Sequence, residues 1–368
     1  MTPEAIAAEF DVPGQVVTVL NIDTGNVNDT YRVITRTSFS ETQFVLQRIN
    51  HNVFKDPELV MSNMRAITDF AHERLDEYAS RSNRIWQLPL VLKTIDGQDF
   101  YKDGEGNYWR ALSMISSATS HEQVLNVEHA HEAGYVLGHF QKTIADFPVD
   151  QLGDTLPGFH ITPTYLAYHD QVVQTDDAQD RLKGSSEARR VEAYIQERRE
   201  FASVLEEAKE RGELKIRPIH GDPKITNIMI DDITGKGTAI IDLDTVKPGL
   251  IHYDIGDSVR SSCNPAGEEE KDLSKVFIDL DSFEALMKGY QKQAREFLSE
   301  ADQHYMFDAI RLLTFELLIR FFSDYLAGDV YFKTNYEAHN LNRARVQMKL
   351  CESIEARESM IRRILDRV

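Results

Sequence analysis

The chain has 368 residues, more than a single hydrophobic core usually serves, so two domains are expected. Its formal net charge of −19 argues against nucleic acid or an anionic membrane as a main partner. The two cysteines show neither zinc spacing nor a disulfide framework, the start MTPEAIAAEFDV lacks a signal-peptide pattern, and no apolar run is long enough for a membrane span. A cytoplasmic protein is therefore expected.

The first hundred or so residues predict a small α+β lobe. Segments rich in β-forming residues alternate with turns of Asp, Asn and Gly. One helix interrupts them, with Asp56 as its cap and Pro57 at its first position. The expected strands are 15–22, 30–35, 43–49, 90–95 and 108–114.

From residue 116 onward the pattern changes to long helices. The segment 305–326 is apolar on almost every face, which predicts a central buried helix. Gly134 and Gly138 share one face of an earlier helix, where they would let a second helix approach closely. The expected domains are 1–115 and 116–368, with a hinge at 113–118. The other expected helices are 124–147, 182–212 as one helix or a pair, 274–298, and a charged helix that closes the chain.

The stretch IHGDPKITNIMIDDITGKGTAIIDLD carries the strongest chemical signal. Asp222 lies between Gly221 and Pro223, where no helix can run, so its carboxylate projects from a loop. Asn227 and Asp242 flank a predicted hairpin and supply a neutral and a charged oxygen, which suits Mg²⁺ held mainly by phosphates and water. Phosphoryl transfer needs a carboxylate that orients the attacking hydroxyl and oxygen ligands for magnesium. Asp222 is the predicted catalytic base, and Asn227 and Asp242 the predicted metal ligands.

Several further residues could have a functional role, and for each of them an ordinary structural role is the alternative. Asp244 lies two residues beyond Asp242 along the expected strand, and is a second magnesium ligand or a surface carboxylate. Lys224 steadies the transferring phosphoryl group or is an exposed loop lysine. Arg320, inside the apolar helix, pairs with Glu316 or Asp324 or reaches a substrate oxygen. The loop 23–30, which contains Gly25, covers the nucleotide phosphates or is an ordinary hairpin. Its Asn26 and Asn28 are candidates to donate to phosphate or to a substrate hydroxyl, Asn28 as the substrate contact.

HGDxxxxN followed by IIDLD resembles the aminoglycoside phosphotransferase and choline kinase superfamily, which has a protein-kinase-like bilobal fold. The segments DTGNVNDTY, FVLQRIN, WRALSMI, YDIGDSVR, DLSKV, RFFSDYLAGDVYF and HNLNRARVQMKL follow in the expected order. Among members of that superfamily the chain is most similar to the bacterial N-acetylhexosamine 1-kinases. The resemblance implies a small β-rich lobe, a larger helical lobe, and an ATP- and Mg²⁺-dependent kinase acting on the anomeric hydroxyl of N-acetylglucosamine or N-acetylgalactosamine.

The resemblance also implies roles for individual residues. Arg320 and Tyr331 would contact the sugar or its new phosphate, and the adenine of ATP would lie against the backbone near Met114 and Ile115. Gln47 occupies the position of the strand lysine that kinases usually aim at the α- and β-phosphates, while Arg48 should point to the opposite face.

The other functions that remain open are a kinase for another sugar, an amino alcohol or an aminoglycoside, and a nucleotide-binding protein without catalysis. The oligomeric state is also left open.

Overall fold

The computed structural model describes residues 1–22, 27–79 and 84–368, and these divide into two compact units. The first consists of Met1–Thr119, Thr143–Pro157 and Met229–Pro248. The second consists of Ser120–Lys142, Gly158–Ile228 and Gly249–Val368. The boundary expected at residue 115 divides the chain at one point, whereas each unit consists of three segments. The hairpin after residue 228 belongs with the first unit because it pairs with the strand at Ala118–Ser120.

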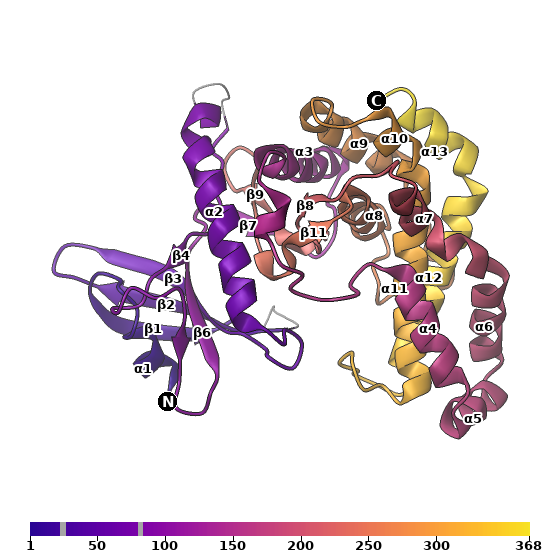
Figure 1. The fold of residues 1–368 in the computed structure, drawn as a ribbon, viewed down its shortest axis with the longest axis horizontal. Coiled ribbons are helices and arrows are strands. Elements are labelled where there is room, and N and C mark those ends of the chain that lie inside the picture. Colours follow the sequence, from indigo (N-terminus) through magenta and orange to yellow (C-terminus); the bar gives the residue numbers. More distant parts are fainter. Residues whose placement is uncertain (23–26, 80–83) are drawn as a thin grey trace. The chain divides into compact units, whose positions relative to one another are not determined.

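A sheet of six strands within the described residues forms the body of the first unit (Figure 1), in the order β1-β2-β3-β6-β4 with β5 paired to β6. The helix α2 begins as predicted, with the N–H of Leu59 donating to Oδ1 of Asp56 at 3.0 Å. The short elements α1 and β5 were not predicted. The bounds are α1 (Pro3–Ala7), β1 (Gln15–Asn21), β2 (Asp29–Arg36), β3 (Glu41–Arg48), α2 (Pro57–Ala79), β4 (Val91–Leu92), β5 (Tyr101–Lys102) and β6 (Tyr108–Ser113).

The predicted hairpin is present in the same unit, where it belongs to a small sheet with the order β10-β9-β7. Its turn is closed by Asp231, whose Oδ1 accepts from the backbone N–H and the hydroxyl of Thr234, each at 2.7 Å. The bounds are β7 (Ala118–Ser120), η1 (Val149–Gln151), β9 (Ile228–Asp231), β10 (Gly237–Ile240), the 3₁₀ turn η4 (Leu243–Thr245) and β11 (Lys247–Gly249).

Helix α11 lies at the centre of the second unit, as its apolar sequence predicted, and it packs against α12, α8 and α4. Figure 1 shows α11, α12 and α4 side by side. The bounds in this unit are α3 (Val127–Ile144), α4 (Thr162–Val173), α5 (Asp176–Gly184), α6 (Ser186–Arg198), η2 (Arg199–Ser203), α7 (Val204–Glu210), β8 (Arg217–Ile219), η3 (Ile225–Asn227), α8 (Ile251–Ser262), η5 (Leu273–Lys275), α9 (Leu280–Ala294), α10 (Glu300–His304), α11 (Met306–Ala327), α12 (His339–Ala356) and α13 (Glu358–Leu365).

The glycines of α3 do let a second helix approach. A Cβ on Gly134 would lie 1.9 Å from the carbonyl oxygen of Leu286 in α9, and a Cβ on Gly138 would lie 2.6 Å from that of Tyr290. The segment 182–212, expected as one helix or a pair of helices, contains the end of α5 and then the pair α6 and α7. The break between α5 and α6 lies at Ser185, whose extended backbone (φ −130°) lets its hydroxyl cap α6 by accepting from the N–H of Ala188.

The helices α4 and α8 were not predicted. Within the described residues, no helix is long and apolar enough to cross a bilayer.

Candidate active site

The loop between β8 and η3 contains Asp222, and helix α8 holds the backbone just before it. The N–H groups of His220 and Gly221 donate to Oδ2 and Oδ1 of Asp254, at 2.9 and 2.8 Å. Burial raises the pKa of Asp254, and these hydrogen bonds oppose that rise. Gly221 has φ +87°, a left-handed conformation that favours glycine. The carboxylate of Asp254 therefore fixes the direction from which the chain enters Asp222.

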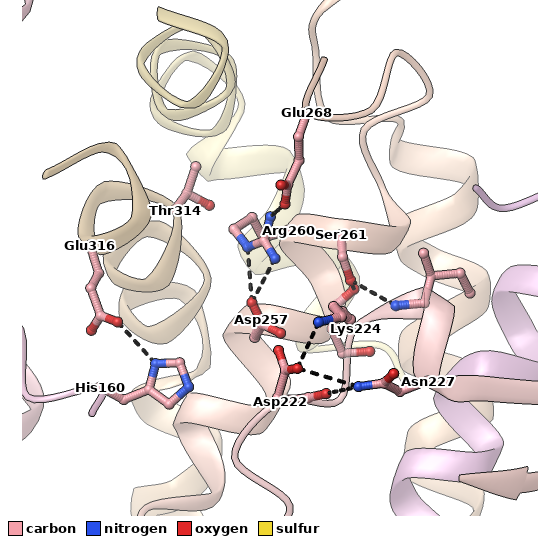
Figure 2. A network of polar contacts seen from close by, with 12 residues as sticks. His160, Asp222, Lys224, Asn227, Asp257, Arg260, Ser261, Glu268, Thr314 and Glu316 are labelled. Atoms are coloured by element: carbon pink, nitrogen blue, oxygen red, sulfur yellow. Dashed lines mark hydrogen bonds and ion pairs between the residues drawn. The ribbon is translucent and has the colours of Figure 1, made fainter. Parts of the chain in front are cut away.

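Two further residues of α8 contact or face this loop (Figure 2). The N–H of Ile225 donates to Oγ of Ser261 at 3.2 Å. Asp257 forms a buried ion pair with Arg260, Nη2 to Oδ1 at 2.8 Å, and Arg260 also pairs with Glu268. Burial raises the pKa of Asp257, but Arg260 outweighs it and the pKa is lowered, so Asp257 stays ionised.

Asp222 itself is partly exposed and has one carboxylate oxygen engaged. Nζ of Lys224 lies 2.8 Å from Oδ2 of Asp222, and Nδ2 of Asn227 donates to the backbone oxygen of Asp222 at 2.7 Å (Figure 2). Oδ1 of Asp222 has no hydrogen-bond partner in residues 1–22, 27–79 and 84–368. One carboxylate oxygen is thus left to accept a proton from a hydroxyl group.

The two predicted magnesium ligands, Asn227 and Asp242, lie in different units, and their shared role stays a prediction. Because Nδ2 of Asn227 donates to the protein backbone, its Oδ1 is the atom left for a ligand role. Asp242 is exposed and has φ +66°, a left-handed conformation rare outside glycine. An amide oxygen and a carboxylate are ligands that Mg²⁺ accepts.

The expectation that Asp242 and Asp244 lie along one strand is wrong. β10 ends at Ile240, and the 3₁₀ turn that follows exposes Asp242 and buries Asp244. A strand's alternation of faces does not apply to such a turn.

His160 joins the loop to α11. Its Nε2 lies 2.7 Å from the carbonyl oxygen of Gly221. Its Nδ1 lies 3.0 Å from Oε1 of Glu316 (Figure 2). Both partners only accept, so both ring nitrogens carry a proton and the imidazole is positively charged. Burial lowers the pKa of His160, but Glu316 outweighs this and the pKa is raised. Thr162 also donates to Glu316, at 3.0 Å. His160 is a positioning group that ties Gly221 to α11.

Arg320 lies one turn from Glu316 on α11, and their closest approach is 3.9 Å. Three aromatic rings surround its guanidinium group, at 5.1 Å for Phe159, 5.1 Å for Tyr165 and 5.6 Å for Phe332. The side chain is 15% exposed and makes no hydrogen bond within the described part of the chain. Burial lowers its pKa, but nearby groups outweigh this and raise it, namely Tyr165, Glu316, Tyr331 and Asp222. The predicted residues Asp222 and Tyr331 are thus both within electrostatic reach of Arg320.

Asp324 fixes the segment that carries Tyr331. Its Oδ1 accepts from the N–H groups of Val330 and Tyr331, at 3.0 and 2.8 Å, and its Oδ2 accepts from that of Phe332 at 3.0 Å. Tyr331 is 58% exposed, and its ring packs edge-on against Phe332. Asp324 therefore holds both rings beside α11 and is not the partner of Arg320.

The candidates of the first unit gather around a buried arginine. Gln47 in β3 accepts from Arg110 in β6, and Arg110 forms an ion pair with Asp244. Asn28 donates to the other oxygen of Asp244 at 2.7 Å. Arg48 pairs with Asp29 at the surface, on the face of β3 opposite to Gln47, as predicted. The carboxylate of Asp244 thus has two protein partners, Arg110 and Asn28. Its role as a ligand of a second magnesium ion stays a prediction.

The remaining nucleotide candidates lie near the end of β6 or outside the described residues. Met114, half-buried, and Ile115, buried, come directly after that strand. Gly25 and Asn26 lie outside the described residues. Their predicted roles in nucleotide binding stay predictions.

Four residues that support the candidates were not predicted as functional: Arg110 in the first unit, and His160, Asp254 and Asp257 in the second. Three helix positions of YDIGDSVR, three residues apart, carry Asp254, Asp257 and Arg260 on one face of α8. That spacing was the available signal for the loop support. Arg110 and His160 give no local signal, because their partners are more than 60 residues away.

Comparisons with known proteins also indicate a phosphotransferase. The sequence profile described as "Phosphotransferase enzyme family" matches residues 18–274 of the chain, which is more than half of it. An aminoglycoside phosphotransferase structure from Alicyclobacillus acidocaldarius is similar with a TM-score of 0.61 at 14% identity, covering 100% of this chain and 97% of that chain.

A microcompartment-associated aminopropanol kinase has a TM-score of 0.59 at 16% identity, covering 98% of this chain and 97% of that one. A choline kinase from Cryptosporidium parvum has a TM-score of 0.54 at 14% identity, covering 95% and 91%. These structures confirm the predicted fold class.

Proposed function

The chain belongs to the phosphotransferase enzyme family, and from that premise we propose that it is an ATP- and Mg²⁺-dependent kinase for an N-acetylhexosamine. The acceptor is the anomeric hydroxyl of N-acetylglucosamine or N-acetylgalactosamine, and the product is the sugar 1-phosphate. The hydroxyl oxygen bonds to the γ-phosphorus, the bond from that phosphorus to the β,γ-bridging oxygen breaks, and ADP leaves.

Asp222 acts as the catalytic base in this proposal. Lys224 engages its Oδ2, which leaves Oδ1 to orient the acceptor hydroxyl and take its proton. Asp254 and His160 keep the loop in place, because they bond the backbone of the two residues before Asp222. The base is therefore positioned before the acceptor arrives.

Asn227 and Asp242 would hold magnesium through the amide oxygen and the carboxylate. The ion, when bound on the nucleotide phosphates, neutralises charge that develops during transfer. The backbone at Met114 and Ile115 is the proposed adenine contact, and Gly25 and Asn26 are proposed phosphate contacts.

Arg320 is the observation that favours a sugar over a cationic acceptor. A buried guanidinium group close to Asp222 repels an ammonium group, whereas its N–H donors suit the oxygens of a neutral sugar. Aromatic rings around it offer apolar faces to a pyranose, and Tyr331 adds a hydroxyl. After transfer, Arg320 would face the new phosphate. Lys224 and Asn28 are further proposed substrate contacts.

A kinase for an amino alcohol or aminoglycoside is the second candidate. The names of the similar structures favour it, since they include an aminopropanol kinase and a choline kinase. The charge at Arg320 counts against it.

A coupled ADP-release assay tests the proposal. Purified protein should release ADP only when an N-acetylhexosamine is present, and Asp222→Asn should lower that turnover by about 10³-fold or more. The matched control is Asp180→Asn, an exposed aspartate that pairs with Lys183 at 3.3 Å on α5 and should leave turnover unchanged. Full turnover in Asp222→Asn would remove Asp222 from the reaction.

A further inference from the structure

The strand lysine that kinases aim at the α- and β-phosphates is replaced here by a neutral residue, Gln47 in β3. The residue directly opposite Gln47 across the β3–β6 pairing is Arg110. Side chains directly opposite in an antiparallel pair share a face of the sheet. The position of Gln47 in β3 therefore carries no charge of its own, but the neighbouring strand β6 places the cation of Arg110 beside it.

Two side chains fix the guanidinium group of Arg110. Its Nε and Nη2 donate to Oε1 of Gln47 at 2.9 and 2.7 Å, and its Nη2 lies 2.5 Å from Oδ1 of Asp244. The side chains of Arg110 and Asp244 are only 1% and 3% exposed. A buried charge of this kind is stable only with a partner, and the carboxylate of Asp244 is that partner.

One nitrogen of Arg110, which carries two N–H groups, remains. Its Nη1 is buried and has no hydrogen-bond partner among residues 1–22, 27–79 and 84–368. A buried donor without a partner is costly, and native proteins leave few of them. An unpaired guanidinium N–H at this place points to an oxygen-bearing ligand.

The other side of Asp244 leads to the loop expected to cover the phosphates. Oδ2 of Asp244 accepts from Nδ2 of Asn28 at 2.7 Å, and Oδ1 of Asn28 accepts from the N–H of Asn50 at 3.0 Å. Asp244 thus joins the turn after β10 to the start of β2 and to Arg110 in β6. Its Oδ2 therefore has a hydrogen-bond partner, whereas its Oδ1 is buried and has only the ion pair with Arg110 among the described residues.

We propose that Arg110 is the cation that contacts the nucleotide phosphates in this protein, in place of the strand lysine, with Gln47 and Asp244 as the positioning residues that hold it. Asp244 is then an anchor for Arg110 and not a second magnesium ligand. The inference rests on the proposed use of ATP, but it is independent of the acceptor.

Nucleotide binding without metal tests the phosphate contact. Isothermal calorimetry in EDTA compares ADP with adenosine, which has no phosphate. Arg110→Gln should weaken ADP binding by about 10-fold or more and leave adenosine binding unchanged, since one charge-assisted contact is lost. Equal ADP affinity in the two proteins, or an equal loss for ADP and adenosine, would overturn the proposal.

A charge exchange provides the rescue. The double variant Arg110→Gln/Gln47→Lys returns the cation to β3 and should recover most of the ADP affinity, whereas no recovery would count against the shared position. Arg48→Gln removes the exposed arginine next along the same strand and should change nothing. If Arg110→Gln alone unfolds, Arg110→Gln/Asp244→Asn replaces it, because that variant leaves no buried charge unpaired.

A magnesium titration separates the anchor from a metal ligand. The Mg²⁺ concentration that half-maximally strengthens ADP binding should rise in Asp242→Asn and stay unchanged in Asp244→Asn. An equal rise in both variants would make Asp244 a ligand and overturn its assignment as an anchor. Absence of ADP binding by the unaltered protein would overturn ATP use itself, whereas a wrong acceptor would leave all of these results in place.

Discussion

Arg110 in the sheet unit and Arg320 in the helical unit are both buried arginines, but the protein holds them by different means. Arg110 is fixed by two hydrogen bonds to the amide oxygen of Gln47 and by an ion pair with the carboxylate of Asp244. Arg320 is surrounded by the faces of three aromatic rings, and its nearest carboxylate oxygen is 3.9 Å away. Aromatic faces stabilise the charge without using the N–H donors.

The difference indicates two kinds of ligand contact. Arg110 is a rigid cation with one nitrogen, Nη1, left unpartnered among the described residues, which suits a fixed phosphate group. Arg320 keeps its planar set of donors, which suits a ligand with several oxygens in different directions, such as a sugar and then its phosphate. Substitutions at the two arginines should therefore affect different substrates.

The largest effect is expected from Arg320→Met. Loss of its charge-assisted hydrogen bonds should lower kcat/KM for the N-acetylhexosamine by about 10²-fold, while the KM for ATP stays within a few-fold. Initial rates with each substrate varied in turn measure this. The control is Arg311→Met, another α11 arginine over an aromatic ring, which already pairs with Glu355. A rise in the KM for ATP, with kcat/KM for the N-acetylhexosamine unchanged, would reverse the roles assigned to Arg110 and Arg320.

A smaller effect is expected from Asp324→Ala, which sharpens the aromatic half of the comparison. Without this carboxylate the N–H groups of residues 330–332 lose their acceptor, so Phe332 and Tyr331 are no longer held beside Arg320. The KM for the acceptor should rise by about 10-fold, since part of the binding surface must be ordered by the substrate. Asp324→Asn keeps one acceptor oxygen, so its KM for the acceptor should lie between those of the unaltered protein and Asp324→Ala. An unchanged acceptor KM in a folded variant would exclude the segment from the sugar site.

The smallest effect on turnover, a few-fold loss, is expected from His160→Gln. This substitution should be detected most clearly in the free energy of unfolding and its dependence on pH. The pKa of His160 is raised in the folded protein by Glu316, so its contribution is complete below the unfolded pKa of about 6.5 and is lost as pH rises through the folded value. Asp257 and Glu316 both favour the charged ring. Urea unfolding should show the largest difference between the two proteins near pH 6 and a narrowing difference at higher pH. A difference that widens with pH would mean that His160 is neutral when folded.

Local sequence patterns predicted the strands β1 to β3, the hairpin and the central helix α11. These depend on alternation, turn residues and helical spacing within a short stretch of chain. The pairing of Arg320 with Glu316 was among the options for the same reason, because residues four apart on a helix are neighbours.

The residues that were missed depend on contacts between distant segments. Arg110 lies in a strand whose sequence gives no sign that Gln47, 63 residues earlier, stands opposite to it. His160 has partners 61 and 156 residues away. The turn at Asp242 was missed for another reason. An apolar run does not show where the strand pairing ends, so Asp242 and Asp244 were expected to share one face.

The position of the transferred phosphate tests the central claim most directly. The protein is incubated with ATP, Mg²⁺ and equal concentrations of N-acetylglucosamine, N-acetylgalactosamine, choline, aminopropanol and an aminoglycoside, and the products are assigned by ³¹P–¹H NMR. The account predicts a phosphate on the anomeric oxygen of an N-acetylhexosamine and none on the cationic acceptors. Phosphorylation of choline, aminopropanol or the aminoglycoside, with no sugar 1-phosphate formed, would contradict it.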